Sequence, residues 1–257
     1  MKFSFLSSVY PSLSLAELLA KAQQYGYEGL ELRVEWGHQH GVELAASAKQ
    51  RAQARQQFAD QGLACAGLAT GVRFISPEAR ERAQQVELLK KYLDLAAEVG
   101  AACVRIFGDP VPTESEAARR QAMVWEAEGI AAVDDWAGRR GVTVCLETHG
   151  NLLASWATQI LEQSGAEHAA ILWHAAHHVR HGQSVEEAWS YLQGKIRHGH
   201  VNVTEERVPP DEIRRTFELL QAAGFTGFYS VEVINPPDPE AVLKQHAEYF
   251  AAYRGGN

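Results

Sequence analysis

A recurring order of helix, glycine and apolar strand constrains this chain more than any other feature of its sequence. Stretches with helical periodicity end at a glycine, and a short apolar run typical of a buried strand follows within a few residues. Eight apolar runs alternate with helices along the chain. The glycines that end predicted helices are Gly26, Gly62, Gly100, Gly141 and Gly224. The predicted strands cover residues 3–6, 29–34, 63–68, 101–107, 142–147, 169–173, 196–201 and 227–231.

Strict alternation of strands and helices predicts a parallel sheet, because each helix returns the chain to the edge where the next strand begins. Eight such units in 257 residues predict an α/β fold of the (β/α)8 or TIM barrel type, as a single domain over residues 1–257. The alternative is a doubly wound open sheet, which usually carries a glycine-rich phosphate loop after its first strand. Residues 7–11, with the sequence SSVYP, contain no such loop.

The predicted helices carry regular start and stop signals. Ser14 and Glu17 form a capping-box pattern, in which each side chain accepts a hydrogen bond from the backbone N–H of the other residue. The helix that they open ends before Gly26. The remaining predicted helices cover about residues 43–60, 77–99, 114–140, 152–163, 184–192, 210–223 and 239–253.

The charge of the chain disfavours nucleic acid as a partner. The formal net charge is −8 and no run of basic residues is present, so phosphate backbones would be repelled. Cys65, Cys103 and Cys145 lie in apolar runs without a CxxC pair, which favours free buried thiols in a reducing compartment. No apolar segment is long enough to span a membrane, and the residues after Met1 lack a secretory pattern. We therefore expect a cytoplasmic protein that binds neither nucleic acid nor a membrane.

Four consecutive predicted strands end in a residue that can bind a metal ion. Active sites of (β/α)8 barrels lie at the C-terminal ends of the strands, and strand residues alternate between the barrel interior and the helix layer. Each of the four residues shares the phase of the interior positions on its own strand, so all four side chains should point into the mouth of the barrel. The four residues are Glu147, His174, His200 and Glu232.

Two carboxylates and two imidazoles suit a borderline divalent cation. Taken alone, Glu147 could instead cap the following helix or pair with an arginine, and His200 could be a buried, hydrogen-bonded histidine. The occurrence of four such residues in register on consecutive strands favours one shared site. We therefore predict a divalent metal centre at these four strand ends.

Four segments resemble a known family. They are VCLETHG at 144–150, LWHAAHHVRHG at 172–182, HGHVNV at 198–203 and GFTGFYSVE at 224–232. On these segments, and on VRIFGD at 104–109, the chain resembles the sugar phosphate isomerase/epimerase superfamily, the xylose isomerase-like TIM barrels. The resemblance implies a carbohydrate substrate and a Zn, Mn, Co or Mg ion bound by the four residues named above. It also implies catalysis by Glu147 and Glu232 and a substrate contact from His177.

The chain departs from the family pattern at several positions. Family members usually carry Asp where His174 stands, Lys and Asp where Asn202 and Val203 stand, and Glu where Gln183 stands. A neutral His174 leaves two negative charges among the ligands instead of the family's three, which favours Zn²⁺, Co²⁺ or Ni²⁺ over Mg²⁺ and Mn²⁺. The alternatives are a three-ligand site with His174 turned away, and a member that has lost catalysis.

Other polar residues near the strand ends are candidates for substrate binding. Arg105 has interior phase and suits a hydroxyl, carboxylate or phosphate group of a substrate, or else a buried ion pair. Arg33 ends the second strand and could reach the mouth or form a surface ion pair. His149 follows the fifth strand and could contact a substrate oxygen or serve the loop. We expect His178 to be exposed to solvent.

The preferred hypothesis is a divalent-metal-dependent sugar isomerase or epimerase. The metal would acidify the α C–H bond of a substrate carbonyl, and one glutamate would remove a proton that the other returns to the enediolate. A keto-polyol dehydratase of the inosose type begins with the same step, so the sequence does not separate the two. A non-catalytic sugar-binding barrel is the alternative from another class. A homodimer is possible, since such barrels often pair through surface helices.

Overall fold

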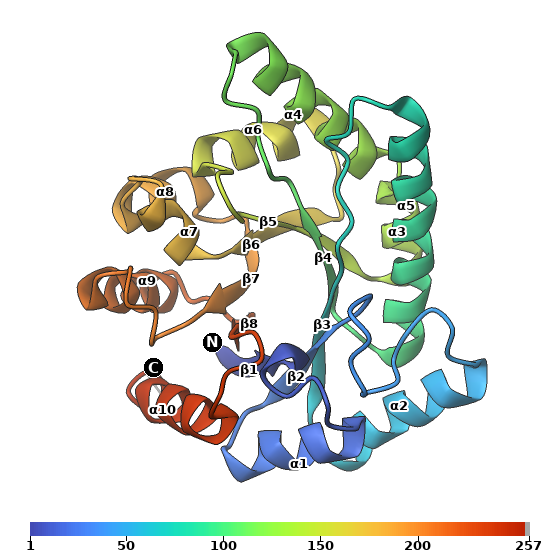
Figure 1. Ribbon diagram of the computed structural model, residues 1–257, viewed down its shortest axis with the longest axis vertical. Coiled ribbons are helices and arrows are strands. Elements are labelled where there is room, and N and C mark those ends of the chain that lie inside the picture. The colour runs from blue at the N-terminus through green and yellow to red at the C-terminus, as the bar shows by residue number, and fades with distance from the viewer. Residues whose placement is uncertain (255–257) are drawn as a thin grey trace.

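The computed structural model describes residues 1–254, so the last three residues of the predicted domain, 255–257, lie outside the described residues. Eight parallel strands close into a barrel in sequence order, and the helices surround it (Figure 1). The predicted TIM barrel is confirmed. The strands are β1 (Lys2–Leu6), β2 (Gly29–Arg33), β3 (Ala64–Ala69), β4 (Cys103–Phe107), β5 (Thr143–Glu147), β6 (Ala169–Trp173), β7 (Ile196–Val201) and β8 (Phe228–Val231).

The helices follow the predicted order, with the capping box of Ser14 and Glu17 in place at the start of the first helix. A short 3-10 helix at Ser7–Val9 follows β1. The α-helices are α1 (Leu15–Gln24), α2 (Ala48–Asp60), α3 (Ala79–Val99), α4 (Glu116–Ala131), α5 (Asp134–Arg140), α6 (Ala154–Ser164), α7 (Ala175–Arg180), α8 (Val185–Leu192), α9 (Pro210–Ala222) and α10 (Pro239–Ala251).

The structure corrects two of the predicted helices. The single helix predicted over 114–140 is two helices, α4 and α5, because the chain turns at Ala132 and Val133. The carboxylate of Asp134 then accepts hydrogen bonds from the backbone N–H groups of Glu167 and His168, which ties the start of α5 to the loop before β6. Helix α2 begins five residues later than predicted, after Ser47, whose side chain caps it.

The barrel separates two sets of buried side chains. Outward strand residues such as Val144 and Tyr229 join the large apolar layer between the strands and the helices. Inside the barrel, Cys103, Cys145 and Leu172 form a small apolar cluster of their own. All three cysteines are buried and free, as predicted. Most of the remaining interior residues toward the mouth are polar or charged, so this part of the barrel interior is not an apolar core.

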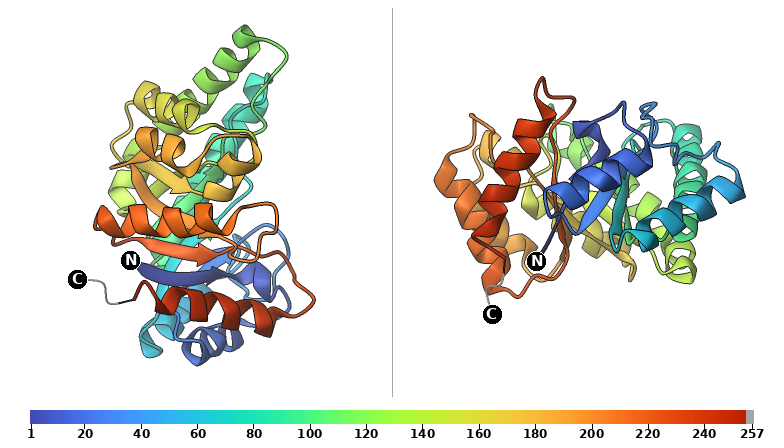
Figure 2. Two further views of the ribbon diagram at one scale, coloured as in Figure 1. Left: turned by 90° about the vertical axis from the view of Figure 1, so that its left-hand side faces the viewer. Right: turned by 90° about the horizontal axis from the view of Figure 1, so that it is seen from below.

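Strands β1 and β8 close the ring, and α10 lies alongside them (Figure 2). Phe3 of β1 stacks on Phe250 of α10 with ring centroids 4.1 Å apart. Inside the barrel, the hydroxyl groups of Ser4 and Ser230 hydrogen-bond across the same seam at 2.5 Å. Aromatic packing outside and a hydrogen bond inside therefore hold the closing pair. Among the described residues, no helix has both the length and the apolar character needed to cross a membrane.

Candidate metal centre

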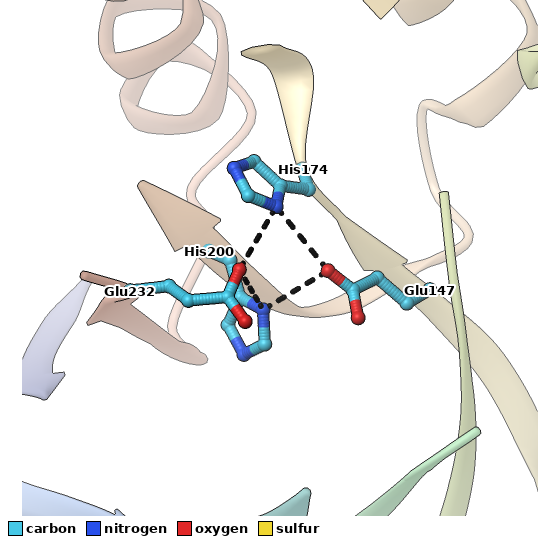
Figure 3. Close-up of side chains that lie close together, drawn as sticks. All are labelled: Glu147, His174, His200 and Glu232. Atoms are coloured by element: carbon cyan, nitrogen blue, oxygen red, sulfur yellow. Dashed lines mark hydrogen bonds and ion pairs between the residues drawn. The ribbon is translucent and has the colours of Figure 1, made fainter. Parts of the chain in front are cut away.

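The structure brings the four predicted strand-end residues together in the mouth of the barrel (Figure 3). His174 Nδ1 lies 3.2 Å from Glu147 Oε1 and 3.2 Å from Glu232 Oε2. His200 Nδ1 lies 3.2 Å and 3.3 Å from the same two oxygen atoms. Both imidazoles therefore face the same pair of carboxylate oxygens, and His174 is turned into the cluster rather than away from it.

The four donor atoms fit a divalent cation. All of them lie within 4.8 Å of one another, and ligands about 2.0–2.2 Å from a shared ion stand about 3–3.5 Å apart. A single N–H on each imidazole could point at only one of its two oxygens, whereas an ion at the centre satisfies all four atoms. Nitrogen and oxygen donors in equal number suit Zn²⁺, Co²⁺ or Ni²⁺.

Local backbone structure sets the position of His174. It follows the last residue of β6 and precedes the short helix α7. Its backbone N–H donates to the hydroxyl of Thr148, and the backbone N–H of Thr148 donates to the carbonyl of Leu172. The threonine after Glu147 therefore fixes the strand end that carries the next ligand. Helix α7 itself was not predicted, because six residues are too few to display a helical period.

Arg105 forms the buried ion pair that was one of its two predicted alternatives. Its Nη1 donates to Glu147 Oε2 at 3.0 Å, and both side chains are almost inaccessible to solvent. Burial works to raise the pKa of Glu147, but the Arg105 guanidinium and His200 outweigh it and hold that pKa well below its usual range. Glu147 thus stays ionised, with one oxygen in the cluster and the other bound to Arg105.

The two glutamates are therefore not equivalent. Glu232 lies at the end of β8 and retains some exposure to solvent, whereas Glu147 has none. Glu232 Oε2 faces both imidazoles, and Glu232 Oε1 has no hydrogen-bond partner among residues 1–254. Burial acts to raise the pKa of Glu232, and His200 and His174 outweigh it and lower that pKa. Only Glu232 keeps a free carboxylate oxygen beside the cluster.

Glu31 is a site residue that the sequence interpretation missed. His200 Nε2 lies 3.1 Å from both oxygens of this β2 carboxylate, and His198 Nε2 lies 2.7 Å from Glu31 Oε2. Burial would raise the pKa of Glu31, but His198 and His200 lower it strongly. The sequence did contain a sign of this residue, because Glu31 lies in the middle of an apolar strand. A buried carboxylate is costly unless a partner compensates its charge.

His177 and His149 lie beside the cluster on the side of β5 and β6. The ring of His177 is 4.3 Å from that of His174 and 4.2 Å from that of His149. His177 Nδ1 accepts a hydrogen bond from the backbone N–H of Gly150, so the proton of the neutral ring resides on Nε2. Burial and the neighbouring His174 lower the pKa of His177, which keeps the ring neutral. His149 Nδ1 lies 3.0 Å from Asp109 Oδ2.

Arg33 and His178 lie in different environments. Arg33 is half-buried with its guanidinium 4.0 Å from the ring centroid of Trp36, and it pairs with no carboxylate among the described residues. The prediction that His178 is exposed is wrong, because α7 turns this side chain inward and leaves it 1% exposed. Burial lowers its pKa to about 3, so it is a neutral core residue.

Comparison with known protein families identifies the family of the chain. The family model described as xylose isomerase-like TIM barrel matches residues 19–253. The chain belongs to this family. A search of curated proteins finds no match to the chain.

Solved structures of similar fold cover nearly the whole chain. A structure of L-ribulose 3-epimerase has a TM-score of 0.81 at 20% identity, over 98% of this chain and 93% of that one. A structure of D-psicose 3-epimerase with D-fructose has a TM-score of 0.80 at 15% identity, over 100% of both chains. The probable 3-DHS dehydratase AsbF of Bacillus anthracis has a TM-score of 0.76 at 17% identity, over 99% and 100%. At these identities the likeness establishes the fold.

Proposed function

We propose that this protein is a metal-dependent isomerase or epimerase that acts on a sugar or a sugar-like polyol. The observation that carries the proposal is the placement of Glu147 and Glu232 on two sides of a centre that both His174 and His200 face. Carboxylates in this relation can remove a proton from a bound substrate and return it. The similar structures of sugar 3-epimerases support the substrate class.

The four residues of the cluster would hold the metal ion. When bound, the ion would supply Lewis-acid stabilisation of the negative charge that develops on a substrate oxygen during proton removal. His200 is oriented for this role by Glu31, and His174 by Thr148. Carboxylates that orient metal-binding imidazoles fix both the ring and its tautomer.

Glu232 and Glu147 would have unequal parts in proton transfer. Glu232 removes the proton next to the carbonyl through its free oxygen, which leaves the substrate as an enediolate. Glu147 is the weaker base, because Arg105 binds its second oxygen. An isomerase can let Glu232 deliver the same proton to the neighbouring carbon. An epimerase must protonate the opposite face of the enediolate, and the ionised Glu147 could do so only after it takes up a proton from solvent or from a substrate hydroxyl. His177 would contact a substrate oxygen from beside the cluster, with Arg180 Nη2 lying 3.0 Å from its Nδ1 and 3.3 Å from its Nε2.

Exchange of substrate hydrogen with solvent tests this function. Protein loaded with Mn²⁺ or Co²⁺ is incubated in D₂O with D-psicose or L-ribulose, and deuterium at the carbon beside the carbonyl is measured by NMR. We expect exchange in the wild type and a loss of about 10²–10⁴-fold in Glu232→Gln. Glu126→Gln, which alters a buried glutamate outside the cluster, serves as the matched control. Full exchange in Glu232→Gln would refute the role of this residue.

A keto-polyol dehydratase is the second candidate. The specific observation in its favour is that Glu232 alone has a free oxygen, since dehydration needs one base to remove the α-proton before a β-hydroxyl leaves. The likeness to a probable dehydratase accords with it. Mass spectrometry separates the two functions, because a dehydratase gives a product lighter by one water and an isomerase or epimerase gives one of equal mass. A non-catalytic barrel would give neither exchange nor a new product.

A further inference from the structure

Three arginines lie on the β2–β4 side of the barrel: Arg33 ends β2, Arg73 lies in the loop after β3, and Arg105 lies within β4. Arg105 lies with its guanidinium 3.8 Å from the ring centroid of Phe107, and Arg73 lies 5.1 Å from the same centroid. Arg33 stacks on Trp36, and Trp36 packs against the loop that carries Arg73, since a Cβ on Gly71 would lie 3.4 Å from it. Two aromatic rings thus connect three guanidinium groups.

These guanidinium groups have more hydrogen-bond donors than acceptors. Arg105 is 1% exposed, and only its Nη1 has a partner; its Nε and Nη2 are buried without one. The Nε of Arg33 is also buried without a partner. Buried N–H groups are nearly always paired, and leaving one unpaired costs about 1–3 kcal/mol. The arrangement therefore calls for an acceptor that the protein does not supply.

Protein carboxylates balance only part of this charge. Among the described residues Arg33 and Arg73 form no ion pair, and Arg105 shares Glu147 with the metal cluster. Glu126 is electrostatically close to Arg73, but burial raises its pKa to about 8, so it is mostly protonated at neutral pH. A divalent ion in the cluster would add further positive charge. Glu35 also lies beside the loop that carries Arg73, where its Oε2 accepts a hydrogen bond from the N–H of Gly71, and Glu31 is bound to His198 and His200. Positive charge is therefore concentrated at the three guanidinium groups, not over the whole mouth.

Arg33 also responds to Arg105 and to the two glutamates of the cluster. Burial lowers the pKa of Arg33 first, the nearby Arg105 lowers it further, and Glu232 and Glu147 act in the opposite direction. Arg33 is therefore close to both glutamates of the centre as well as to Arg105. An anionic group held here would belong to a molecule that also reaches the cluster.

We propose that the substrate of this site carries an anionic group, a carboxylate or a phosphate, that binds among Arg33, Arg73 and Arg105. The assignment rests on the proposed function, because it describes the substrate of the same site. Guanidinium groups bind carboxylate and phosphate oxygens through paired, charge-assisted hydrogen bonds. The anionic group lies on the β2–β4 side, while the carbonyl end of the molecule lies between Glu147 and Glu232.

Three ketoses that differ at one carbon test the proposal. D-fructose is neutral, D-fructuronate carries a carboxylate at C6, and D-fructose 6-phosphate carries a phosphate there. Binding of each is measured by isothermal titration calorimetry, with and without Mn²⁺, so that the readout does not depend on turnover. We expect one of the two anions to bind at least about tenfold more tightly than D-fructose, and its identity distinguishes the carboxylate from the phosphate.

Variants assign the preference to the arginines. Arg33→Gln and Arg73→Gln should each reduce the ratio of anion to D-fructose affinity by about 3–10-fold, and the double variant should abolish it. Arg139→Gln makes the same charge change on exposed α5, just before β5 begins at the opposite end of the barrel, and should leave the ratio unchanged. The variants retain Arg105, so the ion pair with Glu147 remains to support the fold.

Each outcome has a definite meaning. Equal or tighter binding of D-fructose, no binding of any of the three ketoses, or a preference that survives in the double variant would overturn the anionic substrate. An anion preference without deuterium exchange on the preferred anionic ketose would instead count against the proposed isomerase or epimerase function alone. Exchange on a neutral ketose without an anion preference would leave that function standing and refute this inference.

Discussion

Glu31 Oε1 and His200 Nε2 lie 3.1 Å apart inside the barrel, and the opposite nitrogen of the same imidazole faces the metal cluster. The carboxylate therefore accepts from the Nε2–H of His200 and leaves Nδ1 facing the centre, where it would be the ligand atom for a bound ion. This relationship links the second strand to the seventh across the barrel. It makes Glu31 a positioning residue for the proposed ligand.

Replacement of Glu31 by Gln should weaken metal binding without removing a ligand. We expect the affinity for Zn²⁺ or Co²⁺ to fall by about 10–100-fold, because an amide orients the imidazole less strongly than a carboxylate. Metal titration by calorimetry measures the change, and circular dichroism checks the fold. Glu126→Gln is the matched control and should bind metal like the wild type. Unchanged affinity in Glu31→Gln would show that His200 needs no such support.

Replacement of His174 by Asp should change which ions the centre prefers. The substitution places a negative oxygen donor where a neutral nitrogen now stands. We expect the affinity ratio of Mn²⁺ to Zn²⁺ to rise by about tenfold or more, since oxygen donors favour harder ions. Competition between the two ions, followed by elemental analysis, measures this ratio. An unchanged ratio would mean that His174 is not a ligand.

Replacement of Arg105 by Met should destabilise the metal-free protein. The change leaves Glu147 buried without its partner, and breaking a buried ion pair from one side costs about 3–5 kcal/mol. Saturating Mn²⁺ should recover part of the loss, because an ion in the cluster compensates the same carboxylate. Urea unfolding with and without the ion measures both quantities. Arg105→Lys keeps the charge and should lose less; equal stability of the Met variant and the wild type would contradict the prediction.

Glu126 should make stability depend on pH. Its backbone partner is the N–H of Phe74, and burial raises its pKa from 4.5 to about 8. Between these values the folded protein retains a proton that the unfolded chain has lost. Its contribution is therefore fully favourable below pH 4.5, and stability declines by about 1.4 kcal/mol per pH unit as pH rises toward 8, then levels off.

Glu126→Gln removes this titration and keeps an oxygen that can accept from Phe74 N–H. The stability of the variant relative to the wild type should therefore increase from acid pH up to about pH 8. Urea unfolding at a series of pH values gives the difference directly. Glu167→Gln, at an exposed position, should show no such trend. Parallel curves for Glu126→Gln and the wild type would indicate an ordinary pKa for Glu126.

The sequence was sufficient to predict the barrel and its proposed ligands because both follow from local periodicity. Alternation along the apolar strands shows that Glu147 and His174 share the side of the interior residues. In a closed barrel, that side faces the mouth. Glu31 and His198 could not be paired in this way, since they belong to strands β2 and β7, which are not neighbours in the ring. Their contact depends on closure and on the interior diameter of the barrel, which no local pattern encodes.

The same limit applies to Arg105. Its interior phase was readable, but the choice between a substrate contact and an ion pair depended on the length of its side chain relative to the position of Glu147 on β5. Arg73 gave no signal at all, because it lies in a loop whose path over Phe107 is set by packing rather than by periodicity. The substitution of His for the usual Asp at His174 was visible directly.

The order of the strands divides the centre between two halves of the chain. All four proposed ligands come from β5 to β8, while Glu31 and Arg105, which contact them, come from β2 and β4. A ribosome would complete the supporting half before any ligand is made, and the strands of the two halves pair along the β4–β5 and β8–β1 seams. The affinity for a metal ion would therefore depend on whether the eight-stranded barrel is closed. Conditions that open either seam should release the ion before the helices unfold.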